Sequence, residues 1–221
     1  MSEISDARLD AAAALRELAN AFVAHEADDG TLANVRDTAR ALLPDVTSGA
    51  RRERVPPEFG EIAAGVPVGD AARRHAMADR AVAGPANPTA VEIESTRDGA
   101  DVVALVRFGK AFEGAPGRVH GGMVGAVFDD VTGFVLAYVG KPGFTGRLTV
   151  TYRAPVPIET TIEFRARLRE ESGRKLVVDG EARLDGKLLA TADAMFILVD
   201  PKHFATDAAE LLARVTPPTA S

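Results

Sequence analysis

The stretch GRVHGGMVGAVFDD, residues 117–130, opens an apolar segment that continues to Val139. A segment of this length without proline predicts a helix. Two adjacent carboxylates, Asp129 and Asp130, interrupt it. Because a buried and unpaired carboxylate is costly, a core helix normally excludes one. The acidic pair therefore indicates that negative charge has a functional role in this helix.

Gly121 and Gly122 stand where this helix is expected to begin. Two glycines leave the first-turn N–H groups sterically open, and these groups can donate to a carbonyl oxygen or an oxyanion. Asp129 follows Gly122 by seven residues, a distance of about 10 Å along the helix axis. The two can therefore hardly act on one carbonyl from the same helix. A second, antiparallel copy across a two-fold axis would bring them together, so the spacing predicts a site shared in a dimer.

At these residues the sequence resembles the hotdog-fold acyl-CoA thioesterases, in particular the phenylacetate-degradation-type branch. In that branch a His-Gly-Gly turn opens the long central helix, and a carboxylate follows nine residues after the histidine. Here these residues are His120, Gly121, Gly122 and Asp129. The resemblance covers about residues 84–200. Its other motifs are FEGAPG at 112–117, Thr145, TVTYRAP at 149–155 and GRK at 173–175.

The resemblance implies an α+β fold in which an antiparallel sheet wraps around one long central helix, with a helical extension at the N-terminus. It implies hydrolysis of an acyl-CoA to a free carboxylic acid and coenzyme A, in a homodimer or a dimer of dimers. The Gly122 N–H would polarise the carbonyl, and Asp129 of the partner subunit would attack the carbon or activate a water. Coenzyme A would be part of the substrate. Neither a cofactor nor a metal is expected.

Asp129 lies off the apolar stripe that runs at helical spacing from Met123 to Phe134. It points instead towards glycines, where a second backbone or a ligand can approach closely. This position, with the motif, favours a catalytic carboxylate over a surface or purely structural one. Asp130 is one step, about 100°, further round the helix, and we expect it to have a structural or interface role.

His120 precedes the helix N-terminus, where the positive end of the helix dipole disfavours an imidazolium ion. We therefore expect a neutral ring that holds the loop or bonds the thioester region, rather than a group that transfers a proton. Thr145 comes sixteen residues after Asp129 and is expected to open a strand. By resemblance its hydroxyl positions the attacking water or the carboxylate. An ordinary threonine at a strand edge is the alternative.

Further candidates for substrate binding flank these groups. Arg153 and Arg174 are candidates for the coenzyme A phosphates, because a guanidinium presents a fork suited to phosphate oxygens. Thr151, on the same strand face as Arg153, would support them, and Gly121 belongs to the binding turn by resemblance. Alternatively, these arginines only protect the sheet edge and keep the protein soluble.

Composition restricts the other functional classes. The chain has 221 residues, is 46% hydrophobic and contains no cysteine, which allows a real core and excludes disulfides and thiol nucleophiles. Its net charge of −6 is concentrated in residues 1–50, which hold nine acidic and four basic side chains. A broad basic face for nucleic acid is therefore not expected. The sequence shows neither a secretory signal nor a membrane span, so we expect a cytoplasmic protein.

Two other functions stay open at the level of sequence. One is a non-catalytic acyl-CoA-binding or sensing module on the same fold, with the N-terminal helices as a partner interface. The other is a hydratase or dehydratase, which would need a histidine and an acid placed to move a proton on and off carbon. No Gly-x-Ser-x-Gly elbow, Walker loop, dinucleotide fingerprint or metal-spaced histidine pair occurs in the sequence.

Helix and strand signals divide the chain into four segments: a helical arm at 1–43, an extended connector at 44–90, the hotdog domain at 91–200 and a tail at 201–221. In the arm, two amphipathic helices are expected, with Thr31 capping the second and Pro44 closing it. In the hotdog domain, Asp98-Gly99 marks a hairpin turn, and three long strands follow the central helix.

Overall fold

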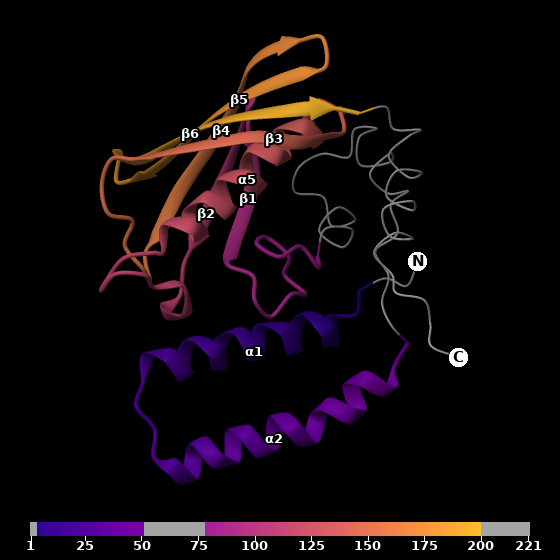
Figure 1. Cartoon of the computed structure of the whole chain (residues 1–221), viewed down its shortest axis with the longest axis vertical. Coiled ribbons are helices and arrows are strands. Elements are labelled where there is room, and N and C mark those ends of the chain that lie inside the picture. Colours follow the sequence, from indigo (N-terminus) through magenta and orange to yellow (C-terminus); the bar gives the residue numbers. More distant parts are fainter. Residues whose placement is uncertain (1–3, 51–77, 200–221) are drawn as a thin grey trace.

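A computed structural model describes residues 4–50 and 78–199. In this part of the chain an antiparallel sheet curves around one helix, and two N-terminal helices lie to one side of it (Figure 1). The expected tail and most of the expected connector lie outside the described residues. The predicted α+β architecture, with its helical extension, is confirmed.

The sheet has six strands in the spatial order β1-β2-β4-β5-β6-β3, and every neighbouring pair is antiparallel. β1 and β3 are therefore its two edges. The strands are β1 (Glu92–Asp98), β2 (Asp101–Arg107), β3 (Gly143–Tyr152), β4 (Thr161–Ser172), β5 (Lys175–Leu184) and β6 (Lys187–Leu198). The helical elements are α1 (Asp6–Ala24), α2 (Asp29–Ser48), the 3₁₀ helix η1 (Lys110–Phe112) and α5 (Gly121–Tyr138).

The core forms where α5 packs into the concave face of the sheet (Figure 1). The strict alternation in β4 buries Ile162, Phe164 and Ala166 beneath the helix. The ring of Phe128 on α5 meets the ring of Phe164 edge-on, with centroids 4.9 Å apart. This packing fixes the rotation of α5 about its axis, and thereby decides which of its residues face away from the sheet.

The first hairpin turns where the sequence predicts it. Asp98 pairs with Asp101, and Gly99 adopts a φ of 61°, a left-handed conformation that glycine takes without strain. At the far end of α5 the Tyr138 hydroxyl donates to the Gly99 carbonyl at 3.1 Å. The turn and the C-terminal end of the central helix are thus tied together.

The arm contains the two expected helices, but two local predictions are wrong. Asp28, rather than Thr31, caps α2, and its carboxylate accepts from the Thr31 N–H at 3.0 Å. Pro44 does not close the helix, which continues to Ser48. α2 has no buried residue, so water can satisfy the carbonyl that Pro44 leaves unpaired. No helix in the described residues is long and apolar enough to cross a membrane.

Candidate active site

His120 caps the N-terminus of α5 with its own side chain. Its Nδ1 accepts a hydrogen bond from the Gly122 N–H at 3.0 Å. An accepting Nδ1 carries no proton, so this contact requires the unprotonated nitrogen of a neutral ring. The predicted oxyanion donor, Gly122 N–H, is therefore engaged by the cap in this structure. The neighbouring Gly121 N–H has no acceptor within the described part of the chain.

Backbone contacts hold this turn in place from two sides. The His120 N–H donates to the Phe112 carbonyl at 2.9 Å. The Tyr152 hydroxyl, at the end of β3, donates to the Gly121 carbonyl at 2.6 Å. A Cβ atom added at Gly121 would lie 3.2 Å from that hydroxyl oxygen. A glycine is thus favoured at this position because the tyrosine approaches so closely, which identifies Tyr152 as a site residue that the sequence did not single out.

A cavity of about 530 Å³ opens beside the His120 turn. Two arginines, Arg118 and Arg153, contribute to its wall. Arg153 was expected near the substrate. Arg118 was not, although it stands only two residues before His120. The lining residues are Gly114, Ala115, Arg118, Val119, His120, Gly121, Val124, Tyr152, Arg153, Ala154, Pro155 and Val156.

Asp129 and Thr145 meet on the open side of α5. The Thr145 hydroxyl donates to Asp129 Oδ1 at 2.8 Å, and both residues are exposed. A Cβ atom added at Gly133, one turn further along the helix, would meet nothing within 4 Å. The carboxylate therefore stands on a helix face that residues 4–50 and 78–199 leave uncovered. The Thr145 hydroxyl thus orients this carboxylate, while its role in catalysis stays a prediction.

Asp130 faces the protein interior and has structural partners. Its side chain is only 14% exposed, with Oδ1 3.6 Å from an Arg80 nitrogen and Oδ2 accepting from the Ala83 N–H at 3.1 Å. Burial raises the pKa of the Asp130 carboxyl, and the positive charge of Arg80 partly opposes that effect. Asp130 thus ties the segment before β1 to the central helix, in line with the structural role expected for it.

Within one chain the predicted site residues form two separate groups, at opposite ends of β3. Tyr152 and the His120 turn lie at one end, and Thr145 with Asp129 at the other. Arg174 also lies at the Thr145 end, where its Nε donates at 3.2 Å to the carbonyl of Leu198, the β6 partner of Gly143. Thr151 is exposed opposite Thr191 and does not line the cavity. The chain alone brings neither Thr151 nor Arg174 to the cavity.

An antiparallel sheet around a central helix that begins at a His-Gly-Gly turn defines a hotdog-fold protein. Residues 116–191 match the family model of the thioesterase superfamily. Over these residues, the expected hotdog domain of this chain is similar to the thioesterase superfamily. The more specific expectation, the phenylacetate-degradation-type branch, stays a prediction.

Individual relatives agree with this assignment. The acyl-coenzyme A thioesterase THEM4 of Mus musculus is 35% identical over 102 residues, which are 45% of this chain and 44% of the relative. THEM4 of Xenopus laevis is 31% identical over 45% of this chain and 46% of its own length. The chain thus spans less than half the length of these two relatives. A crystal structure of a thioesterase superfamily protein superposes with a TM-score of 0.72 at 25% identity, over 89% of this chain and 97% of that one.

Proposed function

We propose that this protein hydrolyses acyl-CoA thioesters to a free carboxylic acid and coenzyme A, at sites formed between two copies of the chain. The match of residues 116–191 to the thioesterase superfamily model and the activity named for the mouse and frog relatives support this reaction class. The observation that carries the proposal is the position of Asp129. Its carboxylate is oriented by Thr145 and points away from its own core, at the opposite end of β3 from the His120 turn.

The edge strand β3 supplies a way to join the two groups. Among the described residues it pairs with β6 alone, and most of its residues are exposed. From residue 145 to residue 152 this edge invites pairing with another strand. Antiparallel pairing of two β3 strands across a two-fold axis would set the Thr145 end of one chain beside the Tyr152 end of the other. Asp129 of the partner subunit would then approach the Gly122 turn.

The chemistry follows from these positions. The thioester oxygen would accept from the first-turn N–H groups, with the Gly122 N–H exchanging its bond to His120 for one to the substrate. Asp129 of the partner subunit would either deprotonate a water that attacks the carbon, or attack directly and form an anhydride that water then cleaves. In both routes the C–S bond breaks, the sulfur leaves as the coenzyme A thiol after taking up a proton, and the acyl group keeps the water oxygen.

Coenzyme A would lie along the cavity at the His120 turn. Arg118 and Arg153 both reach this cavity, and two guanidinium groups in one groove match the negative phosphates of the nucleotide part. Arg174 and Thr151, which stay outside it, would need the partner chain to reach the same ligand.

The decisive test measures thiol release from a panel of acyl-CoA esters. We expect turnover by the wild-type protein, and a loss of at least about 10²-fold in kcat for Asp129→Asn. Stabilisation of the protein by coenzyme A esters should be retained. Asp185→Asn is the matched control, because Asp185 is exposed in a turn at a positive φ that asparagine tolerates. Unchanged turnover in Asp129→Asn would refute this mechanism. Stabilisation by esters without any thiol release would instead establish a binding module.

A further inference from the structure

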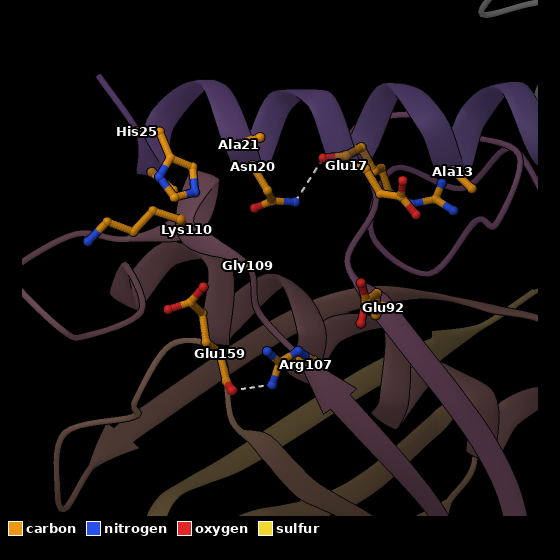
Figure 2. Close-up of a pocket in the computed structure, with 12 residues that line it drawn as sticks. Ala13, Glu17, Asn20, Ala21, His25, Glu92, Arg107, Gly109, Lys110 and Glu159 are labelled. Carbon is orange, nitrogen blue, oxygen red and sulfur yellow. Dashed lines mark hydrogen bonds between the residues drawn. The ribbon is translucent and has the colours of Figure 1, made fainter. Parts of the chain in front are cut away.

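A path of hydrogen bonds joins the N-terminal arm to the candidate site. Asn20 on α1 points toward the loop at Gly109 and Lys110, and the three residues help to line a pocket of about 330 Å³ (Figure 2). Its Nδ2 donates to the Arg16 carbonyl at 2.9 Å, and its Oδ1 accepts from the Ala111 N–H at 3.0 Å. Each half of the amide thus has the partner it requires, and α1 is bonded to η1 across 91 residues of sequence.

η1 in turn determines where α5 begins. Its last residue, Phe112, offers the carbonyl that accepts from the His120 N–H at 2.9 Å. The next residue, Glu113, accepts from the Gly117 N–H at 2.6 Å and pairs with Lys110 at 2.6 Å. Through these bonds a displacement of η1 is passed directly to the His120 turn.

The contact between α1 and this loop leaves no spare room. A Cβ atom added at Gly109 would lie 2.0 Å from Asn20 Oδ1, far inside van der Waals contact. The backbone of Gly109 has a φ of −77°, which any residue can adopt. A glycine is needed there because of the Asn20 side chain, not because of strain in the chain.

Within the described residues, α1 is otherwise held by few contacts. Ala12 is its one buried residue, whereas Leu15, Leu18 and Phe22 are all about half exposed. Arg16 donates to the carbonyls of Pro85 and Asn87, at 2.9 Å each. A helix with so little buried apolar surface contributes little to the stability of the core, so these polar contacts are better explained by the placement of η1.

We propose that Asn20 is a positioning residue of the thioester site, which makes the N-terminal arm part of the catalytic unit. By holding η1 at Ala111, it keeps the Phe112 carbonyl and the His120 turn in the arrangement that presents the first-turn N–H groups to the substrate. This inference rests on the proposed hydrolysis, and its test separates the two.

The first experiment compares three variants of the full chain in the thiol-release assay. Asn20→Ala should lower kcat about fivefold, the factor that one neutral hydrogen bond supports. KM should change by less than about twofold, because Arg118 and Arg153 are untouched. Asn20→Asp keeps an oxygen that accepts from the Ala111 N–H but loses the donor to the Arg16 carbonyl, so it should recover only part of the lost kcat. Leu18→Ala, which shortens an exposed side chain on the same helix, is the control and should behave as wild type.

A second pair of variants tests the contact between Asn20 and Gly109 by changing the loop residue. Gly109→Ala forces the Asn20 side chain away and should lower kcat to the same degree as Asn20→Ala. In the double variant Asn20→Ala/Gly109→Ala the obstruction is gone, so the second substitution should add nothing. Multiplication of the two losses to about 25-fold would show that the residues act independently, and would overturn the proposal.

Amide hydrogen exchange supplies a readout that does not depend on hydrolysis. Asn20→Ala should speed exchange in peptides that contain Ala111 and His120, and Leu18→Ala should not. Absence of thiol release from the wild-type protein would refute the proposed function itself. Normal hydrolysis by the wild type, with kcat and exchange unchanged in Asn20→Ala, would refute the positioning role alone.

Discussion

At the scale of the single residue, His120 has the clearest geometry. It gives its Nδ1 to the helix it precedes, at the N–H that was expected to hold the thioester oxygen. The ring therefore acts as a cap in the structure before substrate arrives. When a carbonyl oxygen accepts the hydrogen bond from the Gly122 N–H, the His120 ring would lose this bond and be free to contact the bound ester. This view assigns His120 to the geometry of the helix start, not to proton transfer.

Substitution of His120 separates these roles. Asparagine is a favoured N-cap and can accept from the same N–H, so His120→Asn should keep kcat within about threefold of wild type. His120→Leu cannot cap and should lose about tenfold. Both proteins would be assayed for thiol release under identical conditions. If His120 were a general base, asparagine could not replace it, and both variants would fall by about 10²-fold or more.

Single residues also show how far sequence reasoning reaches. The face of Asp129 could be predicted, because helical periodicity sets it. Its contact with Thr145 was only one of the alternatives that the sequence left open for that threonine. Tyr152 and Arg118 were missed, because their roles depend on how the end of β3 folds back onto the turn. No spacing along the chain reveals that approach. The hydrogen bond between Gly122 and His120 was also missed, because it depends on a side-chain rotation.

At the scale of the element, α5 divides two adjacent carboxylates between two environments. One step along the helix separates Asp129, exposed beside Thr145, from Asp130, buried beside Arg80 and the Ala83 N–H. The buried carboxyl has its pKa raised from 3.8. The same helix thus presents the proposed catalytic carboxylate on one side and fastens the preceding segment on the other.

The raised pKa predicts a measurable dependence of stability on pH. In the window between 3.8 and the raised value, native Asp130 is protonated while the unfolded chain is not, so the native state binds more protons. The contribution of Asp130 to the free energy of unfolding therefore falls as the pH rises across this window. Asp130→Asn keeps an acceptor for the Ala83 N–H and has no charge to bury.

Urea unfolding of both proteins from about pH 4 to about pH 8 tests this expectation. The stability of Asp130→Asn relative to wild type should increase with pH and then level off. Since all other carboxyl groups are common to the two proteins, their contributions cancel in the difference. A difference that stays constant with pH, or that runs in the opposite direction, would contradict the assignment.

Element boundaries were predicted less well than the elements themselves. Thr31 and Asp28 are both good capping residues, and local sequence alone did not decide between them. Pro44 would end a helix packed in a core, but α2 has no buried residue and tolerates it. The strands of the sheet, in contrast, were recognised because alternation is strict where one face is buried, as in β4.

At the scale of the whole molecule, the described residues form one sheet around one helix, whereas the proposed site is not assembled within one chain. The sheet and its helix assemble from one sequence, as the apolar pattern predicted. The two halves of the proposed site do not, because they lie at opposite ends of β3. The arm is another case in which residues far apart in the sequence meet in the fold. Asn20 contacts Ala111, in the loop before His120, which lies 91 residues further along the chain. Such contacts between distant segments cannot be predicted from a single sequence.

A shared site makes a strong prediction for mixed dimers. Asp129→Asn removes the carboxylate from one half of the site. Gly122→Pro removes the donor from the other half, at a first-turn position where proline costs no helical hydrogen bond. In a heterodimer of the two variants, one site would carry both defects and the other site neither.

The most direct measurement is therefore the activity of these variants, alone and after joint refolding at equal amounts. Each alone should be nearly inactive in thiol release. The mixture should recover about a quarter of the wild-type activity, because half of the randomly formed dimers are mixed and each has one intact site. Light scattering would verify that every sample is a dimer. A mixture no more active than its two parents would show that each chain uses its own carboxylate and its own helix start, and would contradict the shared site.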